Sequence, residues 1–254
     1  MKKTIFFVAV LSMIATQIAL AKTHQSLSWL SVASTKITKG LIEQQPLINV
    51  AAPLKSEKKM MQLFSNILLS TGIEIKVTSV LPQANQTNGS IEYTFLVWYQ
   101  ETKAKRVEVK EKIKALLPGL FKTARTPLEK ELAINDYLCR TVSYDENGKD
   151  NTAYDALFYH TSLCGGIAWL ASEMLIESGI QNRIIIGRAT NFSDFTGYHA
   201  WLEVKIGQTW TMYDPTWCIG NKNHLAFFDV SGKQLSKTHS WNASNFPIAN
   251  KLSI

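Results

Sequence analysis

The sequence predicts an α+β protein in which a helix packs on an antiparallel sheet, with a small α/β region before it. Two helices with clear start and stop signals are expected at 126–140 and 162–179. Two alternating strands follow at 197–206 and 209–214, and the Gly-Gln pair between them favours an antiparallel hairpin. Hydrophobic residues make up 46% of the chain, so a substantial core can form.

Residues 1–21 are expected to be a signal peptide rather than part of the fold. Lys2 and Lys3 give a positive start, residues 5–15 form an apolar run, and 19–21 read Ala-Leu-Ala, a small-x-small cleavage site. The run is too short to span a bilayer, and an uncleaved N-terminal anchor is the alternative. We therefore expect a secreted or cell-envelope protein with no stable membrane anchor after cleavage.

The small α/β region is expected over residues 22–118. Residues 22–54 show no clear period and are interpreted as an extended or loosely packed lead-in. The elements predicted after it are a helix at 56–71, two strands at 73–80 and 91–99 that pair as a hairpin, and a helix at 107–117. Because Pro118 and Gly119 should stop the last helix, the second domain is placed at 119–254.

The formal charge is +7, and removing Lys2 and Lys3 lowers it to +5. A modest basic excess suits contact with anionic cell-wall polymers or membrane surfaces. A nucleic-acid partner is not expected, because the lysines are scattered and no recognition motif accompanies them. The denser stretch at 103–114 alternates Lys with Glu, as a solvated helix face does.

Three cysteines remain beyond the predicted signal peptide, and an odd number leaves at least one of them free. Cys139 and Cys218 could form a disulfide, or both could be buried thiols. A zinc site would have to draw on Cys164, Cys218, His199, His224 and His239, which lack the tight spacings of such sites. No metal and no cofactor are therefore expected.

Cys164 lies in the first turn of the second predicted helix. Ser162 is expected to cap this helix and Gly179 to end it. The unpaired N–H groups at a helix N-terminus lower the pKa of a thiol. Gly165 and Gly166 follow where a substrate carbonyl would approach the backbone, so Gly165 is a candidate substrate-binding residue. The alternative is a buried structural cysteine beside a glycine-rich helix start.

His199 and Asp214 are predicted to be neighbours on one face of the hairpin. A two-residue turn pairs positions whose numbers sum to 415, so Asp214 lies opposite Trp201 and diagonal to His199. A three-residue turn would move Asp214 to the other face. A carboxylate on one ring nitrogen supports the cation formed when the other takes a thiol proton. The alternatives are a half-buried strand histidine and a simple Asp-Pro turn.

Four motifs together resemble the transglutaminase-like superfamily, whose core is similar to that of papain-type enzymes. They are Cys164-Gly165-Gly166, Ile184-Ile185-Ile186-Gly187, Tyr198-His199-Ala200-Trp201 and Asp214-Pro215-Thr216-Trp217. The resemblance covers residues 126–217 and implies that Cys164 is the nucleophile, His199 its base and Asp214 the residue that orients the histidine. It assigns no second oxyanion donor. No acidic Ca²⁺ loop is visible, so calcium dependence is not expected.

Trp201 is a second candidate substrate-binding residue. With Trp210 and Trp217 it could form a platform for a sugar, or it could belong to the core or to a wall that shields the reacting pair. His239 and Trp241 are interpreted as packing or surface residues.

The resemblance implies a secreted, cysteine-dependent acyl-transfer enzyme that acts on amide bonds of proteins or peptides. Its acceptor would be an amine, giving crosslinks, or water, giving hydrolysis. The expected partners are protein or peptide substrates, including cell-wall or cell-surface peptides. The rival interpretation is a non-catalytic module that keeps the fold and binds peptides or cell-wall material.

Overall fold

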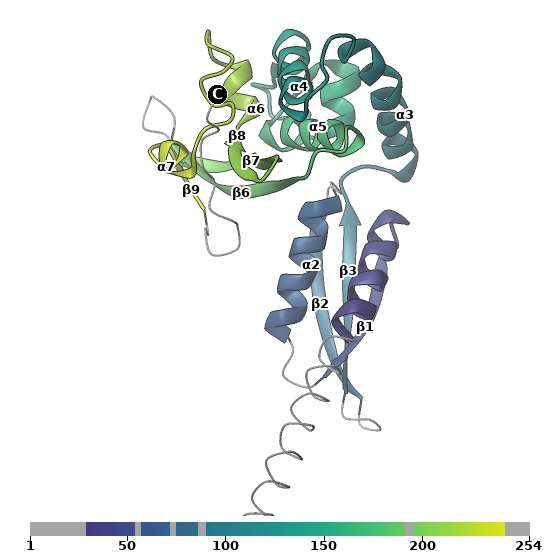
Figure 1. The fold of residues 1–254 in the computed structure, drawn as a ribbon. Helices are drawn as coiled ribbons and strands as arrows, with labels where there is room; N and C mark the ends of the chain where they lie inside the picture. The colour runs from purple at the N-terminus through teal and green to yellow at the C-terminus, as the bar shows by residue number, and fades with distance from the viewer. Residues whose placement is uncertain (1–28, 54–56, 72–74, 86–89, 191–195, 242–254) are drawn as a thin grey trace, which may run out of the picture. The chain divides into compact units, whose positions relative to one another are not determined.

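The computed structural model describes residues 29–53, 57–71, 75–85, 90–190 and 196–241 (Figure 1). The predicted signal peptide lies outside these ranges. The chain divides into two compact units, one up to Trp98 and the other from Tyr99 onward, with residues 69–76 grouped with the second. Among the described residues, no helix has both the length and the apolar character needed to cross a membrane.

The first unit contains a three-stranded sheet with the strand order β1-β3-β2. Its elements are a helix at 29–42, β1 (Leu47–Pro53), α2 (Glu57–Thr71), β2 (Ile75–Asn85) and β3 (Ser90–Tyr99). β2 and β3 are adjacent in the sheet, as the predicted hairpin requires, and β1 pairs with β3 in antiparallel register. Phe64 of α2 stacks on Phe95 of β3 with ring centroids 4.3 Å apart.

The interpretation of residues 22–54 as a loose lead-in was wrong for the part that the structure describes. Ala33, Ile37 and Leu41 are fully buried at helical spacing. In β1 the residues alternate strictly between exposed and buried positions. The helix and the strand are both short, so the hydrophobic period of each is hidden when residues 22–54 are considered together.

The second unit is an antiparallel four-stranded sheet packed with helices, as the α+β prediction requires (Figure 1). The strand order is β8-β7-β6-β9. The elements are α3 (Lys103–Leu120), α4 (Pro127–Thr141), β4 (Ser143–Tyr144), the π-helix η1 (Asp155–Tyr159), β5 (Thr161–Ser162), α5 (Cys164–Glu177), β6 (Asn182–Thr190), β7 (Thr196–Ile206), β8 (Thr209–Tyr213), α6 (Pro215–Ile219), α7 (Gly232–Leu235) and β9 (His239–Ser240).

α3 belongs to the second unit, so the predicted domain boundary between 118 and 119 falls inside a helix. α3 runs through Pro118 to Leu120, with the proline inside the helix. The helix buries Val109 and Ile113 in the core shared with α4 and α5. Its basic face is also only partly solvated, since Arg106 and Lys110 pair with Glu173 and Glu177 of α5 at 3.4 and 3.0 Å.

α4 begins as the sequence predicts. The Thr126 hydroxyl accepts the backbone N–H of Glu129, and the Glu129 carboxylate accepts the backbone N–H of Thr126 at 2.8 Å. This reciprocal pair satisfies two N–H groups at the helix start, and Pro127 follows at the first helical position.

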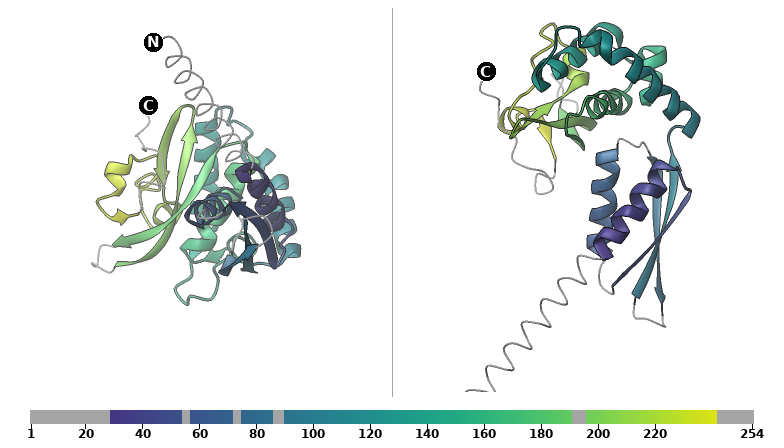
Figure 2. Two further views of the ribbon diagram at one scale, coloured as in Figure 1. Left: turned by 90° about the horizontal axis from the view of Figure 1, so that it is seen from below. Right: turned by 45° about the vertical axis from the view of Figure 1, so that its right-hand side comes forward.

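The sheet of the second unit is covered on both faces. Ala200, Leu202 and Val204 of β7 pack into the larger core with α3, α4 and α5. Trp201 points the other way, into a smaller core with Val230 and Leu235 from the C-terminal segment. The left view of Figure 2 shows the sheet between the helices and α7. The predicted alternation along this strand is confirmed.

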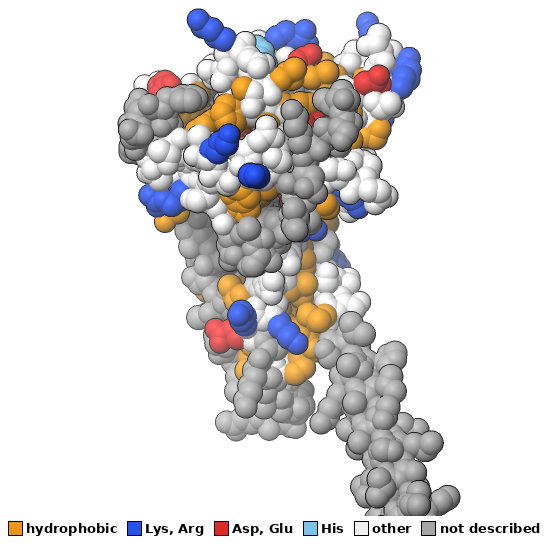
Figure 3. Space-filling model, turned by 60° about the vertical axis from the view of Figure 1, so that its left-hand side comes forward, with side chains coloured by type: hydrophobic (Ala, Val, Ile, Leu, Met, Phe, Trp, Pro, Cys, Tyr) orange, Lys and Arg blue, Asp and Glu red, His pale blue; other side chains and the backbone are white. Residues whose placement is uncertain are grey.

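Charged side chains are spread over the surface. On the face drawn in Figure 3, the described Lys and Arg side chains are scattered and do not gather into one basic patch. This agrees with the scattered lysines in the sequence.

Glu203 of β7 is completely buried, and neither of its carboxyl oxygens has a hydrogen-bond partner among the described residues. Burial raises the pKa of this carboxyl to about 7, although Arg183, its cross-strand neighbour on β6, acts in the opposite direction. Because the folded pKa exceeds the ordinary value of 4.5, the folded state holds a proton that the unfolded chain releases.

We predict that Glu203→Gln raises the melting temperature more at about pH 8 than at about pH 5. The carboxyl of the parent protein stabilises the fold fully below pH 4.5, and this stability is lost as the pH rises through about 7. The glutamine does not titrate. Thermal unfolding at several pH values measures the difference, with Glu146→Gln at an exposed position as the matched change of charge. A constant difference across this range would contradict the prediction.

Candidate active site

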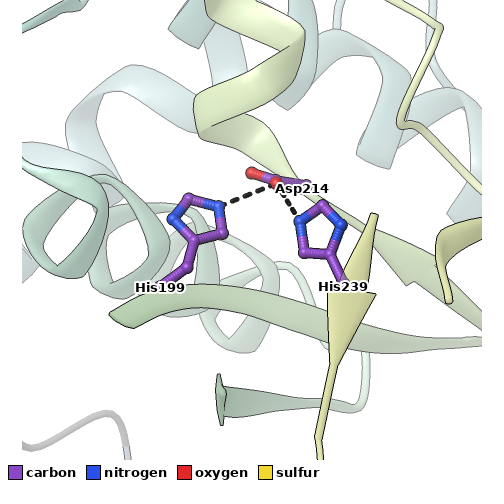
Figure 4. Close-up of side chains that lie close together, drawn as sticks. All are labelled: His199, Asp214 and His239. Carbon is purple, nitrogen blue, oxygen red and sulfur yellow. Dashed lines mark hydrogen bonds and ion pairs between the residues drawn. The ribbon is translucent and has the colours of Figure 1, made fainter. Parts of the chain in front are cut away.

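The structure brings the three predicted residues together from three elements. Cys164 is the first residue of α5, His199 lies on β7, and Asp214 lies at the junction of β8 and α6. His199 interacts with the Cys164 thiol and lowers its pKa. Its Nε2 lies 2.8 Å from Oδ2 of Asp214 (Figure 4).

The register of the hairpin explains why His199 and Asp214 meet. β7 and β8 pair Ile206 with Thr209 and Leu202 with Tyr213, the two-residue turn that was predicted. Gly207 occupies that turn with a φ of +62°, which a residue without a side chain adopts readily. Asp214 therefore follows β8 on the same face as His199, and the predicted register is confirmed.

Asp214 is a completely buried carboxylate with two roles. Its Oδ1 accepts the backbone N–H of Trp217 at 3.1 Å and so caps α6, with Pro215 at the first helical position. Its Oδ2 accepts hydrogen bonds from the ring nitrogens. The Asp-Pro turn and the histidine partner, treated as alternatives in the sequence, are therefore both present.

The start of α5 differs from the prediction that Ser162 caps it. Leu163 is the N-cap and offers no side-chain hydrogen bond. Ser162 lies in β5 with its hydroxyl buried against the carbonyls of Asp150 and Thr152. Asn151 takes over the capping role, since its Oδ1 accepts the backbone N–H of Gly166 at 3.2 Å. The cap comes from a loop, which local sequence cannot reveal.

The loop that carries Asn151 is held by Asp145. One carboxylate oxygen of Asp145 accepts the backbone N–H groups of Lys149 and Asp150 at 2.6 and 2.7 Å, and the other accepts that of Asn147 at 2.9 Å. Three charge-assisted hydrogen bonds fix the loop against the helix start.

Close packing explains why glycine follows Cys164 at two positions. A Cβ on Gly166 would collide with the Ser162 hydroxyl and the Thr152 carbonyl, and one on Gly165 would lie 2.6 Å from Oδ1 of Asn151. Glycine at both positions lets the loop seat on the first turn of α5. A substrate contact at Gly165 stays a prediction.

The charges of the site support one another. For His199, burial lowers the pKa, but the Asp214 carboxylate and then the Cys164 sulfur outweigh it and raise the pKa to about 10. For Cys164, burial raises the pKa, and His199 together with the backbone N–H of Ala200 brings it below the ordinary value. For Asp214, burial raises the pKa, but the two histidines hold it low. The arrangement favours a thiolate beside an imidazolium at neutral pH.

The other two cysteines behave differently. All three cysteines are unpaired, so the disulfide left open by the sequence is not formed. Burial raises the pKa of Cys139 to about 11, and burial also raises that of Cys218 well above its ordinary range. Among the three thiols, Cys164 is the one whose environment favours the reactive thiolate.

The structure also brings a fourth side chain into the site. Nε2 of His239 lies 3.0 Å from the same Oδ2 of Asp214 (Figure 4). The interpretation of His239 as a packing or surface residue was therefore incomplete, because it is buried but carries a polar contact. His239-Ser240-Trp241 resembles the tail of bacterial secreted members of the superfamily, but no role in the site was predicted for His239, since its position depends on the pairing of β9 with β6.

His199, Asp214 and His239 are spaced closely enough to hold a metal ion. In the structure, Nε2 of His199 and Nε2 of His239 lie at hydrogen-bond distance from Oδ2 of Asp214, 2.8 and 3.0 Å away. The cysteines and His224, considered for zinc from the sequence, are not part of this group.

Aromatic rings surround His199. The ring of Trp201 stacks beside it at 5.9 Å and that of Trp217 lies at 6.0 Å, measured between centroids. Trp201 is completely buried, so it cannot serve as the substrate-binding surface that was considered. Trp210 lies apart, beneath the Arg183 guanidinium. The first two rings form the wall that the sequence left as an alternative to a sugar platform.

Part of the chain is similar to known proteins. Residues 114–215 match the model of the Transglutaminase-like superfamily, which confirms the predicted resemblance. Kyphoscoliosis peptidase of Mus musculus is 29% identical over 133 residues, 47% of this chain and 20% of that protein. Its Homo sapiens counterpart is 30% identical over 130 residues, 46% of this chain and again 20% of that protein. The chain thus matches only a small part of these relatives.

The fold was also compared with solved structures. A crystal structure of a TGase aligns with a TM-score of 0.41 at 16% identity, covering 78% of this chain and 56% of that one.

We predict that Gly166→Ala destabilises the protein by about 1–3 kcal/mol, because the added methyl group overlaps the Ser162 hydroxyl and the Thr152 carbonyl. Thermal or denaturant unfolding measures the loss. Gly119→Ala is the matched control, since a Cβ there meets no atom within 4 Å. Equal stability of the two variants would show that the helix start is not closely packed.

We further predict that iodoacetamide alkylates Cys164 near neutral pH far faster than Cys139, because only Cys164 has a lowered pKa. His199→Asn should slow the reaction of Cys164 by roughly 100-fold at pH 7, since the loss of His199 leaves burial to raise the thiol pKa. Mass spectrometry of the cysteine peptides gives both rates in one sample. Equal rates for the two thiols, or no effect of His199→Asn, would refute the ion pair.

Proposed function

Since residues 114–215 form a transglutaminase-like core, we propose that this protein is a cysteine-dependent acyl-transfer enzyme acting on amide bonds of proteins or peptides. One observation carries the proposal. The Cys164 thiol, with its lowered pKa, lies at the start of α5 against His199, and His199 is in turn held by the buried Asp214 carboxylate. This is the arrangement of nucleophile, base and orienting group that acyl transfer requires.

In the proposed first half-reaction, the Cys164 thiolate attacks the amide carbonyl carbon. The backbone N–H of Cys164, at the helix start, can donate to the developing oxyanion. The His199 imidazolium then gives its proton to the leaving amine as the C–N bond breaks, which leaves a thioester on Cys164 and a neutral imidazole. Asp214 stays ionised and keeps the imidazole in position.

In the second half-reaction an acceptor enters and His199 works as a base. The imidazole takes a proton from the acceptor while its oxygen or nitrogen attacks the thioester carbonyl, and the thiolate leaves. With water the product is an acid, and with a lysine amine it is a new amide. Both outcomes use the same groups, so the proposal covers hydrolysis and crosslinking.

One feature supports a peptide as the substrate. Tyr144 is 41% exposed, and its phenol interacts electrostatically with the Cys164 sulfur. An exposed aromatic ring beside a nucleophile suits a peptide side chain better than a small ion. From the signal-like N-terminus we also propose that the protein acts outside the membrane on cell-surface or cell-wall peptides.

The proposed function is tested by incubating the protein with a glutamine-containing peptide, with and without a primary amine, and following products by mass. We predict deamidation or backbone cleavage without the amine, and amine incorporation if the enzyme is a transferase. Cys164→Ser should reduce every product by about 10³-fold or more, because the thiolate is the nucleophile.

Cys139→Ser is the matched control, since Cys139 is half-buried and carries no role in the proposed reaction. It should keep the parent activity. A protein that binds the peptide but leaves it unchanged in both conditions would favour the non-catalytic module.

A further inference from the structure

Two histidines share one oxygen of Asp214, although the acyl-transfer chemistry needs only one of them. Nε2 of His199 and Nε2 of His239 lie 2.8 and 3.0 Å from Oδ2, and their ring centroids are 5.5 Å apart (Figure 4). Only His199 also contacts Cys164. The second histidine therefore has a separate purpose.

Both ring nitrogens of His239 have a partner. Its Nδ1 lies 2.9 Å from the Thr238 hydroxyl, which donates to the carbonyl oxygen of Leu235 at 3.3 Å. An ionised carboxylate only accepts hydrogen bonds, so Nε2 of His239 carries a hydrogen and donates it to Asp214.

The ring of His239 is locked in this orientation. Its side chain is completely buried, and the rings of Trp201 and Trp217 lie at 4.9 and 4.6 Å from it. The backbone is held as well, because β9 pairs His239 with Ala189 and Thr190 donates its N–H to Thr238. Because the ring cannot rotate, its Nε2 can hold the Asp214 carboxylate in one orientation.

We propose that His239 is a positioning residue for Asp214, which holds Oδ2 in line with His199, and that the C-terminal strand β9 thereby completes the site. The proposal rests on the proposed function for its catalytic meaning. Residue 239 lies beyond the segment 114–215 that matches the superfamily model, so that match does not assign it. The reason is physical: the backbone N–H of Trp217 holds Oδ1, and a second, fixed donor on Oδ2 beside His199 sets the direction in which that oxygen faces the imidazole.

The test compares His239→Leu, which removes the donor, with His239→Gln, whose amide nitrogen can take the place of Nε2. His224→Gln, at an exposed histidine, is the matched control. Alkylation of Cys164 at pH 7 should be about 10-fold slower in the leucine variant and within about 3-fold of the parent rate in the glutamine variant and the control. If the leucine variant does not fold, Thr238→Val replaces it, because it removes only the hydroxyl that contacts Nδ1 of His239.

A second readout does not depend on reactivity. In protein labelled with ¹⁵N-histidine, the Nε2–H signal of His199 is identified by its loss in His199→Asn. We expect this signal to move in His239→Leu and to return close to its parent position in His239→Gln. A residue that only fills space would lower the melting temperature of both variants and leave the His199 signal unchanged.

The outcomes separate the two proposals. An unreactive Cys164 in the parent protein, with a His199 signal that still moves in His239→Leu, refutes the proposed function and supports the positioning role. A reactive Cys164 whose rate and His199 signal are unchanged by His239→Leu refutes the positioning role alone. A glutamine variant as impaired as the leucine variant also overturns it, since the hydrogen bond would then not be what matters.

Discussion

The buried carboxylate of Asp214 is the constraint on which the rest of the site depends. A fully buried charge is costly unless several donors surround it. Its donors come from three places: His199 on β7, His239 on β9 and the backbone of Trp217 in α6. The strands and the helix must therefore hold one relative arrangement, and the same arrangement aims the imidazole of His199 at Cys164.

The nucleophile side of the site depends on a second set of contacts. α5 has no side-chain cap of its own, and Asn151 supplies one from a loop that Asp145 fixes. The glycines after Cys164 make room for that loop. Cys164 thus sits at a helix start that is rigid on the protein side, while its sulfur is stabilised by His199 and the backbone of Ala200. Rigid support of this kind suits a reacting group.

Predictions from local pattern succeeded where neighbours in sequence decide the structure. The capping box at Thr126 and the α5 stop at Gly179 depend on residues a few positions apart. The helix at 29–42 was missed because its apolar spacing was diluted by the irregular residues around it. α3 was ended too early because Pro118 was taken as a breaker, whereas the helix continues through it to Leu120.

By itself the sequence determined the hairpin register and therefore the meeting of His199 with Asp214, because a two-residue turn and strict alternation leave one face available. It also determined which cysteine begins a helix. Only the tertiary structure decided that Asn151 caps that helix, that Trp201 is buried away from substrate, and that His239 shares the Asp214 carboxylate. Those contacts join segments that are separated in the sequence, so a local sequence pattern cannot predict them.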